Sequence, residues 1–317
     1  MTVCAALCLL AVGGNAAAQR YPSKPIRLVV GFAPGGNVDI TARLVAQKLT
    51  LALGEPVVVD NRGGAGGMIG ADLVAKSTPD GYTLLVVSSS HMINAATVKN
   101  SPYDPVKDFS PISTLTYGPH FVSVNAAMPV SSVKELIALA RAKPGTINFG
   151  SAGIGSLTHL EGEFFKSAAG IDIVHIPYKS TNLAFTDMLG GHVHLVFSST
   201  VSTLPFVKTG KIKVIAVTGS NRLAAFPEIP TVAESGLSQF IVDSVAGLLA
   251  PAKTPRDIVN KLSAEAIKFL RTPEMHSALA AQGAEAGGST PQEYSAKIGV
   301  EIARWKKVVA NAGITTQ

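Results

Sequence analysis

Two glycine-rich segments contain the residue types that could bind a small anion. Residues 31–37 (GFAPGGN) and 150–156 (GSAGIGS) each follow an apolar run typical of a strand and precede a helical pattern. Glycine lets backbone N–H groups approach a ligand closely, and a helix N-terminus adds unpaired N–H groups and a partial positive charge. Because the segments lie in different halves of the chain, they predict two backbone clamps facing across a cleft, although glycines also serve ordinary turns.

Neither segment matches a nucleotide-binding or hydrolase motif. The second has its glycines as G-x-x-G-x-G rather than G-x-G-x-x-G, and the sequence contains no G-x-x-x-x-G-K-[ST]. The nucleophile motif G-x-S-x-G is absent around Ser151, since Phe149 lies two positions before it. We therefore expect no cofactor and no serine nucleophile here.

Hydroxyl side chains follow three further predicted strands. They occupy residues 88–91 (SSSH), 178–181 (YKST) and 198–200 (SST). Neutral donors and acceptors of this kind can orient a small polar solute; the alternative is that they only cap solvated loops. Ser89, Tyr178 and Ser198 are the candidate ligand contacts from these runs.

The histidines favour neither a metal site nor a catalytic base. His192 and His194 would share a strand face, but no third ligand lies near them in the sequence, and the segment around His159 lacks the H-E-x-x-H spacing. His159, beside the second glycine segment, is better placed as a neutral hydrogen-bonding group. An enzyme that uses His159 or His91 as a base is the alternative, and no nucleophile, base and orienting group can be assembled to support it.

Strands alternate with helices as far as about residue 217, and the remainder is mostly helical with one late, isolated strand at 245–250. Local signals mark several helix ends: Gly54 ends the first helix, Ser132 and Glu135 form a capping box, Thr254 and Thr290 each precede a Pro as an N-cap, and Glu293 completes a second capping box. This order predicts an α/β protein with mostly parallel sheets covered on both faces. Ligands then lie beyond the carboxyl ends of the strands, where the two glycine segments fall. The length of 317 residues predicts two domains, with the C-terminal helices returning to the first.

The first 18 residues have the pattern of a secretory signal peptide. Residues 3–12 are apolar, and Ala16-Ala17-Ala18 offers small residues for cleavage before Gln19, although no Lys or Arg precedes the apolar run. Ten residues are too few to span a bilayer. The alternative is a buried N-terminal helix. The signal pattern predicts a soluble, exported protein, and because both cysteines lie in this segment, we expect the mature chain to have no thiols or disulfides.

The charge of the chain excludes some partners. The formal net charge is +6, but the Lys and Arg residues are scattered, whereas a nucleic-acid-binding protein concentrates them in a stripe. We therefore expect no nucleic-acid partner.

The sequence resembles the Bug solute receptors of tripartite tricarboxylate transporters, over almost the whole mature chain. The motifs that carry the resemblance occur in the order of the family: residues 21–26 (YPSKPI), 35–39 (GGNVD), 61–67 (NRGGAGG), 79–84 (PDGYTL), 102–109 (PYDPVKDF), 151–160 (SAGIGSLTHL), 175–179 (HIPYK), 230–236 (PTVAESG) and 249–251 (LAP).

The resemblance implies a periplasmic binding protein with a two-lobed, type II Venus-flytrap fold and no catalysis. In this family, loop backbone and ordered water hold the ligand carboxylate. Carried over by position, Phe32, Ala33, Gly35 and Gly36 form the first clamp. The second clamp comprises Ser151, Ala152, Gly155, Ser156, Thr158 and His159. We expect lobe 1 to comprise residues 21–122 and 247–317, lobe 2 residues 123–246, and the hinge to lie near 118–119 and 246–247.

The sequence departs from the family pattern at three places. Gly31 stands where the family often has Pro, residues 180–183 (STNL) replace a stretch similar to Gly-Ser-Ala-Pro, and Ser198 stands where many relatives carry Asp. Without that acid, a ligand ammonium group would lack a partner, so the sequence favours carboxylates without an amine.

The resemblance implies a receptor that closes over a small carboxylate and presents it to the membrane subunits of a tripartite tricarboxylate transporter. We expect this receptor to be a monomer. Closure has this effect only if the ligand binds the closed state better than the open one. A solute sensor that signals to another protein is the alternative, since it differs only in its partner.

Overall fold

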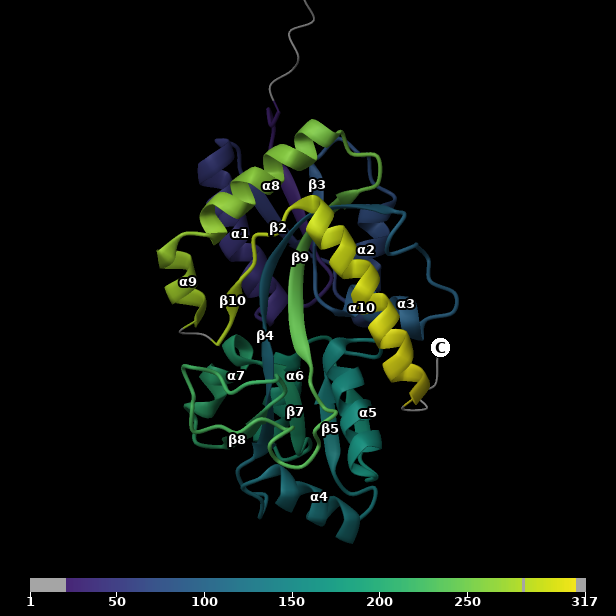
Figure 1. The fold of residues 1–317 in the computed structure, drawn as a ribbon, viewed down its shortest axis with the longest axis vertical. Helices are drawn as coiled ribbons and strands as arrows, with labels where there is room; N and C mark the ends of the chain where they lie inside the picture. The colour runs from purple at the N-terminus through teal and green to yellow at the C-terminus, as the bar shows by residue number, and fades with distance from the viewer. Residues whose placement is uncertain (1–20, 281–282, 312–317) are drawn as a thin grey trace, which may run out of the picture.

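The computed structural model describes residues 21–280 and 283–311, so the predicted signal peptide lies outside the described residues. Figure 1 shows two lobes joined by long strands. Within the described residues the strands are β1 (Ile26–Val30), β2 (Val57–Asn61), β3 (Thr83–Val87), β4 (Phe109–Asn125), β5 (Asn148–Ser151), β6 (Val174–Pro177), β7 (Leu195–Ser199), β8 (Ile212–Val217), β9 (Asp243–Pro251) and β10 (Glu285–Ala286).

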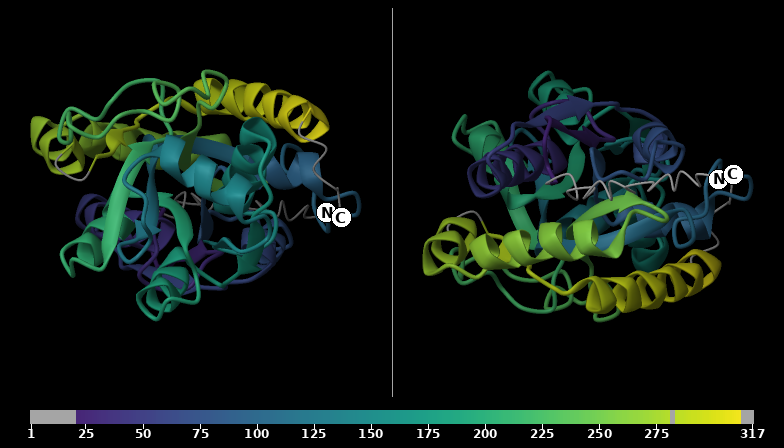
Figure 2. Two further views of the ribbon diagram at one scale, coloured as in Figure 1. Left: turned by 90° about the horizontal axis from the view of Figure 1, so that it is seen from below. Right: turned by 90° about the horizontal axis from the view of Figure 1, so that it is seen from above.

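Helices lie on both sides of the strands in each lobe (Figure 2). They are α1 (Asn37–Leu53), the short η1 (Ala65–Gly67), α2 (Met68–Ala75), α3 (Ser90–Thr97), α4 (Val133–Ala142), α5 (Leu157–Ala169), α6 (Thr181–Leu189), α7 (Thr200–Val207), α8 (Arg256–Leu270), α9 (Pro273–Ala280) and α10 (Pro291–Asn311). None of the helices in the described ranges is long and apolar enough to cross a membrane.

The first lobe contains a parallel core of three strands. β1 pairs in parallel with both β2 and β3, and its residues Ile26, Leu28 and Val30 are fully buried. An apolar strand between two parallel neighbours is buried on both faces, which explains the almost continuous run of apolar residues in the sequence. α1 follows β1 and ends at Gly54, whose φ of 78° allows the left-handed cap.

β4 connects the two lobes and was not predicted from the sequence. From Phe109 to Pro119 it pairs antiparallel with β9, and from His120 onward it pairs antiparallel with β7 and β8. The late strand predicted at 245–250 is confirmed as β9, which lies between β3 and β4 in the sheet and pairs with both. The sheet order is β2-β1-β3-β9-β4-β7-β5-β6, with β8 and β10 attached to β4.

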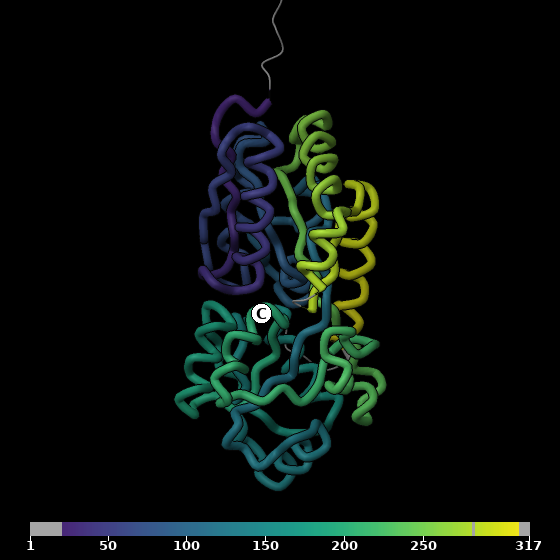
Figure 3. Tube along the Cα trace, turned by 90° about the vertical axis from the view of Figure 1, so that its left-hand side faces the viewer, coloured from purple at the N-terminus to yellow at the C-terminus, as the bar shows by residue number. Residues whose placement is uncertain are grey.

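The second lobe repeats the parallel arrangement. β5 pairs in parallel with β6 and β7. The core of this lobe includes the buried Phe149 of β5, Phe165 of α5 and Phe197 of β7. The predicted cap of α4 is present, because the Ser132 hydroxyl accepts a hydrogen bond from the N–H of Glu135 at 3.2 Å. Figure 3 shows this lobe below the first one.

The C-terminal helices pack on the first lobe, and α10 continues to the second. Tyr294 and Ile298 of α10 pack in the core of the first lobe, whereas Trp305 and Val309 belong to the core of the second. The capping box predicted for α10 is confirmed by hydrogen bonds in both directions between Thr290 and Glu293. The predicted cap of α8 was wrong by one residue, because Pro255 rather than Thr254 is the N-cap.

Candidate ligand-binding site

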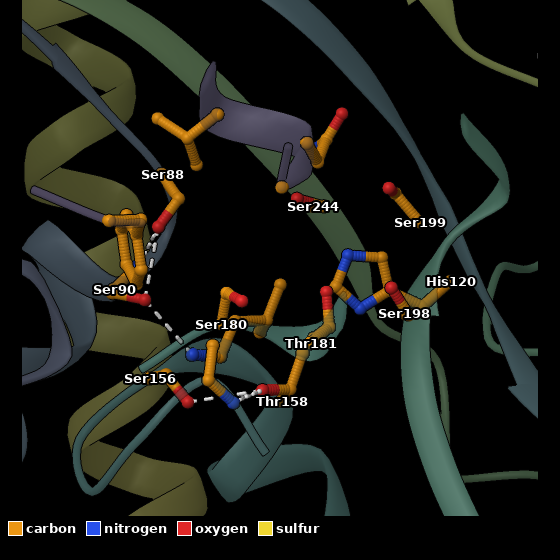
Figure 4. Close-up of a pocket in the computed structure, with 16 residues that line it drawn as sticks. Ser88, Ser90, His120, Ser156, Thr158, Ser180, Thr181, Ser198, Ser199 and Ser244 are labelled. Carbon is orange, nitrogen blue, oxygen red and sulfur yellow. Dashed lines mark hydrogen bonds between the residues drawn. The ribbon is translucent and has the colours of Figure 1, made fainter. Parts of the chain in front are cut away.

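A cavity lies between the two lobes (Figure 4). It encloses about 50 Å³ that the centres of water molecules can occupy, enough for several waters or a small solute. Its lining comprises Phe32, Gly36, Asn37, Val38, Ser88, Ser90, His120, Ala152, Ser156, Leu157, Thr158, Ser180, Thr181, Ser198, Ser199 and Ser244.

The lining gathers the N-termini of five helices. It includes first-turn or capping residues of α1, α3, α5, α6 and α7, each of which follows a strand or loop at the interlobe face. The N-terminus of a helix carries unpaired N–H groups and a partial positive charge, and both favour an anion. The described residues that line the cavity include no Asp, Glu, Lys or Arg. An anion here therefore meets hydroxyl groups, helix ends and one histidine, with no carboxylate to repel it.

Hydrogen bonds join the two lobes beside the cavity. The Asn182 side-chain amide of α6 donates to the carbonyl of Gly35 at 2.6 Å. The N–H of Leu157, at the start of α5, donates to the hydroxyl of Ser90 in α3 at 3.0 Å. Gly66 also approaches the second glycine segment so closely that a Cβ atom there would lie 2.7 Å from the carbonyl oxygen of Ile154. The structure therefore has the lobes in contact around the cavity.

The second glycine segment is held together by its own hydrogen bonds. The N–H of Ala152 donates to the Thr158 hydroxyl at 2.9 Å, and the N–H of Gly153 donates to the Ser151 hydroxyl at 3.0 Å. The N–H of Gly155 donates to Nδ1 of His159 at 3.3 Å. These amides thus fix the shape of the loop, and the hydroxyls of Ser156 and Thr158 line the cavity.

His159 and His175 lie against each other behind this segment. Their ring centroids are 4.2 Å apart, and Nε2 of His175 is 2.6 Å from the Ser151 hydroxyl. Burial lowers the pKa of His159 to about 4, and burial together with the neighbouring His159 lowers the pKa of His175 to about 3. Both rings are therefore neutral at pH 7, in agreement with the hydrogen-bonding role that the sequence indicated for His159.

The cavity brings together about half of the residues chosen from the sequence. Those in its lining are Phe32, Gly36, Ala152, Ser156, Thr158 and Ser198. Those outside the lining are Ala33, Gly35, Ser89, Ser151, Gly155, His159 and Tyr178. Several of the second group have other partners: the Ser89 hydroxyl accepts from the N–H of Val245 at 2.9 Å, and Tyr178 donates to Asp187 at 2.6 Å. That the residues of either group contact the ligand stays a prediction.

Three kinds of lining residue are not among the candidates from the sequence. Ser88, Ser90, Ser180, Thr181 and Ser199 belong to the three hydroxyl runs, and Asn37, Val38 and Leu157 lie in the first turns of α1 and α5. His120 and Ser244 lie on β4 and β9, at the point where the lobes join. No sequence motif marks either position, because the junction between the lobes forms only when these strands, which are distant in the sequence, pair with each other.

The pair of histidines considered for a metal has other roles. Nδ1 of His194 accepts a hydrogen bond from the N–H of Asn148 at 2.9 Å, and the carbonyl of His192 accepts one from the Asn148 side chain at 3.0 Å. Over residues 21–280 and 283–311, no three His, Cys, Asp or Glu side chains gather in a way that could hold a metal ion.

A two-lobed α/β fold, with a cavity at helix N-termini between the lobes, defines a solute-binding receptor of the periplasmic-binding-protein class. The chain belongs to one family within this class: its residues 41–314 match the model described as "Tripartite tricarboxylate transporter family receptor". This match confirms the resemblance found in the sequence.

Three solved structures are similar to almost the whole chain. The periplasmic binding protein BugD is 35% identical with a TM-score of 0.89, and the match covers 94% of this chain and 100% of BugD. Rpa4515 of R. palustris, solved with adipate, is 36% identical with a TM-score of 0.90, over 93% of this chain and 99% of that one. MatC of Rhodopseudomonas palustris, with bound malate, is 30% identical with a TM-score of 0.87, and the match covers 91% of this chain and 100% of MatC. These structures confirm the predicted fold class.

Proposed function

We propose that this protein is a periplasmic receptor that binds a small carboxylate between its lobes and presents it to the membrane subunits of a tripartite tricarboxylate transporter. The observation that carries the proposal is the convergence of five helix N-termini on a cavity where the described residues of the lining include no carboxylate. An anion gains there from several partial positive charges at once. Adipate and malate in two similar structures support the choice of carboxylates.

Binding is tested by thermal shift on residues 19–317 with malate, succinate, glutarate, adipate, benzoate and a set of amino acids. A carboxylate at about a hundred times its Kd stabilises the folded state by about 2.7 kcal/mol, which raises Tm by several degrees. Recovery of the same acid intact after incubation shows binding without turnover. No shift with any acid, and no acid released on denaturation, would contradict the proposal.

A matched pair of variants places the binding in the cavity. Val38→Glu adds a carboxylate to the lining, where Val38 is 7% exposed, whereas Val58→Glu makes the same change on a surface strand at a residue that is 56% exposed. We expect Val38→Glu to abolish the thermal shift through charge repulsion in a desolvated site, and Val58→Glu to retain it.

Transport is tested separately from binding. In cells lacking this protein, uptake of the bound radiolabelled acid should fall, and the wild type but not Val38→Glu should restore it. Unchanged uptake together with an acid-dependent transcriptional response would instead favour the sensor.

A further inference from the structure

His120 is a titratable side chain in the wall of the cavity, and it is paired with a buried acid. Its Nδ1 lies 2.7 Å from Oε2 of Glu161 in α5, and the two residues are 5% and 0% exposed. The backbone of His120 is fixed as well, because its N–H donates to the Thr218 hydroxyl at 2.8 Å and its carbonyl accepts from the N–H of Thr218 at 2.9 Å. The ring thus has one orientation set by both the strand and the acid.

The second ring nitrogen is free to meet a ligand. In the described part of the chain, Nε2 of His120 makes no hydrogen bond. Figure 4 shows the ring on the same side of the cavity as Ser198 and Ser199, with Ser88 and Ser90 on the other side. The His120 ring therefore presents Nε2 to a group of neutral hydroxyls and to whatever solute lies among them.

The protonation state of the His120–Glu161 pair decides whether Nε2 is a hydrogen-bond donor or acceptor. Burial raises the pKa of Glu161, the negative Asp243 raises it further, and the contact with His120 works in the opposite direction. Oε1 of Glu161 has no hydrogen-bond partner among the described residues, so a bare carboxylate here is poorly solvated. When the pair has taken up one proton and is neutral overall, Nε2 carries a hydrogen in both possible arrangements. In the first, His120 is an imidazolium beside the Glu161 carboxylate. In the second, His120 is a neutral imidazole whose Nδ1 accepts a hydrogen bond from the protonated carboxyl of Glu161.

When the pair loses that proton, Nε2 changes from a hydrogen-bond donor to an acceptor. The one ring hydrogen of His120 is then on Nδ1 and is donated to the Glu161 carboxylate, so Nε2 presents a lone pair to the cavity and repels an anion. The other charged group that acts on Glu161 is Asp243 of β9, whose negative charge also favours the charged form of Lys297 in α10. β7 contributes only the hydroxyls of Ser198 and Ser199 to the lining.

We propose that His120 is a specificity-determining residue that donates Nε2–H to an anionic group of the ligand, and that Glu161 is the positioning residue that makes this binding take up a proton. This inference rests on the proposed function, since it assigns a recognition group to the same cavity. An anion entering the cavity stabilises the state with Nε2–H, so the pair holds more protons in the complex than in the free protein. By linkage, affinity falls as pH rises through the range in which the free protein loses the proton.

The experiment is calorimetric titration of the protein with whichever of malate, succinate, glutarate or adipate binds in the thermal-shift panel. Titrations at pH 6, 7 and 8, in phosphate and in Tris, separate proton uptake from the heat of binding. We expect uptake of up to one proton and an affinity that falls by up to about tenfold per pH unit. His120→Phe should lower affinity by about ten- to a hundredfold and abolish uptake, as expected for loss of a hydrogen bond to a charged group.

Two substitutions at Glu161 test whether this residue orients the His120 ring and sets its protonation. In Glu161→Gln the side-chain amide can donate to Nδ1 when an anion is bound, so a neutral His120 presents Nε2–H without taking up a proton. Affinity at pH 7 should therefore stay within about threefold of wild type, without the pH dependence. Glu161→Leu removes the partner and should weaken binding like His120→Phe. The double variant His120→Phe with Glu161→Leu removes both polar groups, and it replaces His120→Phe if an unpaired Glu161 prevents folding. His192→Gln, at an exposed residue, is the control for loss of a histidine.

The outcomes separate this inference from the proposed function. If wild type binds a carboxylate with no proton uptake, and the His120 variants bind it equally well, the role of His120 is overturned while the proposed function stands. If wild type binds none of the acids, both are overturned. Equal pH dependence in wild type and Glu161→Gln would overturn the role of Glu161.

Discussion

The side-chain amide of Asn182 donates a hydrogen bond to the backbone carbonyl of Gly35 at 2.6 Å. This bond joins the first turn of α6 in the second lobe to the glycine segment before α1 in the first. Gly35 is in turn fixed by its N–H, which donates to Asp39 at 2.8 Å. Both glycine segments thus have direct contacts with the opposite lobe, and closure of the lobes depends on a few identifiable atoms.

Asn182→Ala should weaken ligand binding by favouring the open arrangement. Loss of one hydrogen bond across the cleft costs about 1 kcal/mol, which corresponds to about a fivefold increase in Kd for a carboxylate from the panel. Calorimetry measures the affinity, and small-angle scattering of the ligand-bound protein measures closure. Asn221→Ala, at an exposed residue, is the matched control. An unchanged Kd for Asn182→Ala would show that this bond does not stabilise closure.

Gly66→Ala should obstruct closure. Its Cβ atom would lie 2.7 Å from the carbonyl oxygen of Ile154 in the other lobe, and its φ is +62°. Gly54→Ala has a similar φ of +78° but nothing within 4 Å, so it reports the strain of the left-handed conformation alone. Both variants should lose about 1–2 kcal/mol in denaturant unfolding. Only Gly66→Ala should also bind the carboxylate more weakly, and equal affinity of the two variants would contradict this expectation.

The parts of the fold that the sequence predicted correctly are those set by near neighbours in the chain. The end of α1 at Gly54 and the capping box of Thr290 and Glu293 depend on residues within one helical turn, so their signals are local. β1 was predicted because burial on both faces leaves a continuous apolar run. β4 was missed because its 17 residues include two prolines and several hydroxyl side chains, and its pairing with β9, β7 and β8 involves residues far away in the sequence.

The same reason limits what could be predicted of the site. The first turns of α1 and α5 follow glycine segments that are visible as motifs, so Gly36, Ser156 and Thr158 could be chosen in advance. His120 lies 41 residues before Glu161 in the sequence, and the two meet only because β4 enters the second lobe beside α5. No spacing rule covers such a pair.

Ser198→Asp should weaken carboxylate binding and shift preference toward amino acids. Ser198 is 1% exposed, lines the cavity, and lies beside the β4 residue Phe121, next to His120. A new carboxylate there repels an acidic ligand and offers an ammonium group a partner; we expect Kd for malate or adipate to rise about tenfold or more. Ser198→Ala, which removes the hydroxyl without adding charge, is the control. An unchanged ratio of affinities for malate and aspartate would count against the preference for ligands without an amine.

His91 should make the protein less stable in mild acid. Its ring packs against Tyr103 and Phe109, which also contact each other, and its Nε2–H donates to the carbonyl of Pro105 at 3.0 Å. Burial lowers the pKa of His91 to about 4, below the value of about 6.5 expected in the unfolded chain. The unfolded state therefore binds more protons between these values, so stability falls as pH decreases from 6.5 toward 4.

The contribution of His91 is measurable by urea unfolding at pH 7.5 and pH 5. The two pKa values correspond to a loss of about 2 kcal/mol between these conditions from His91 alone. His91→Phe keeps an aromatic ring packed against Tyr103 and Phe109 but cannot take up a proton, so its free energy of unfolding should fall less over the same range, by about that amount. His276→Gln removes a histidine from an exposed position and is the control. If His91→Phe and wild type lose stability equally, the ring of His91 does not resist protonation in the folded protein, and the acid sensitivity must come from other groups, among which the buried His159 and His175 are the next to substitute.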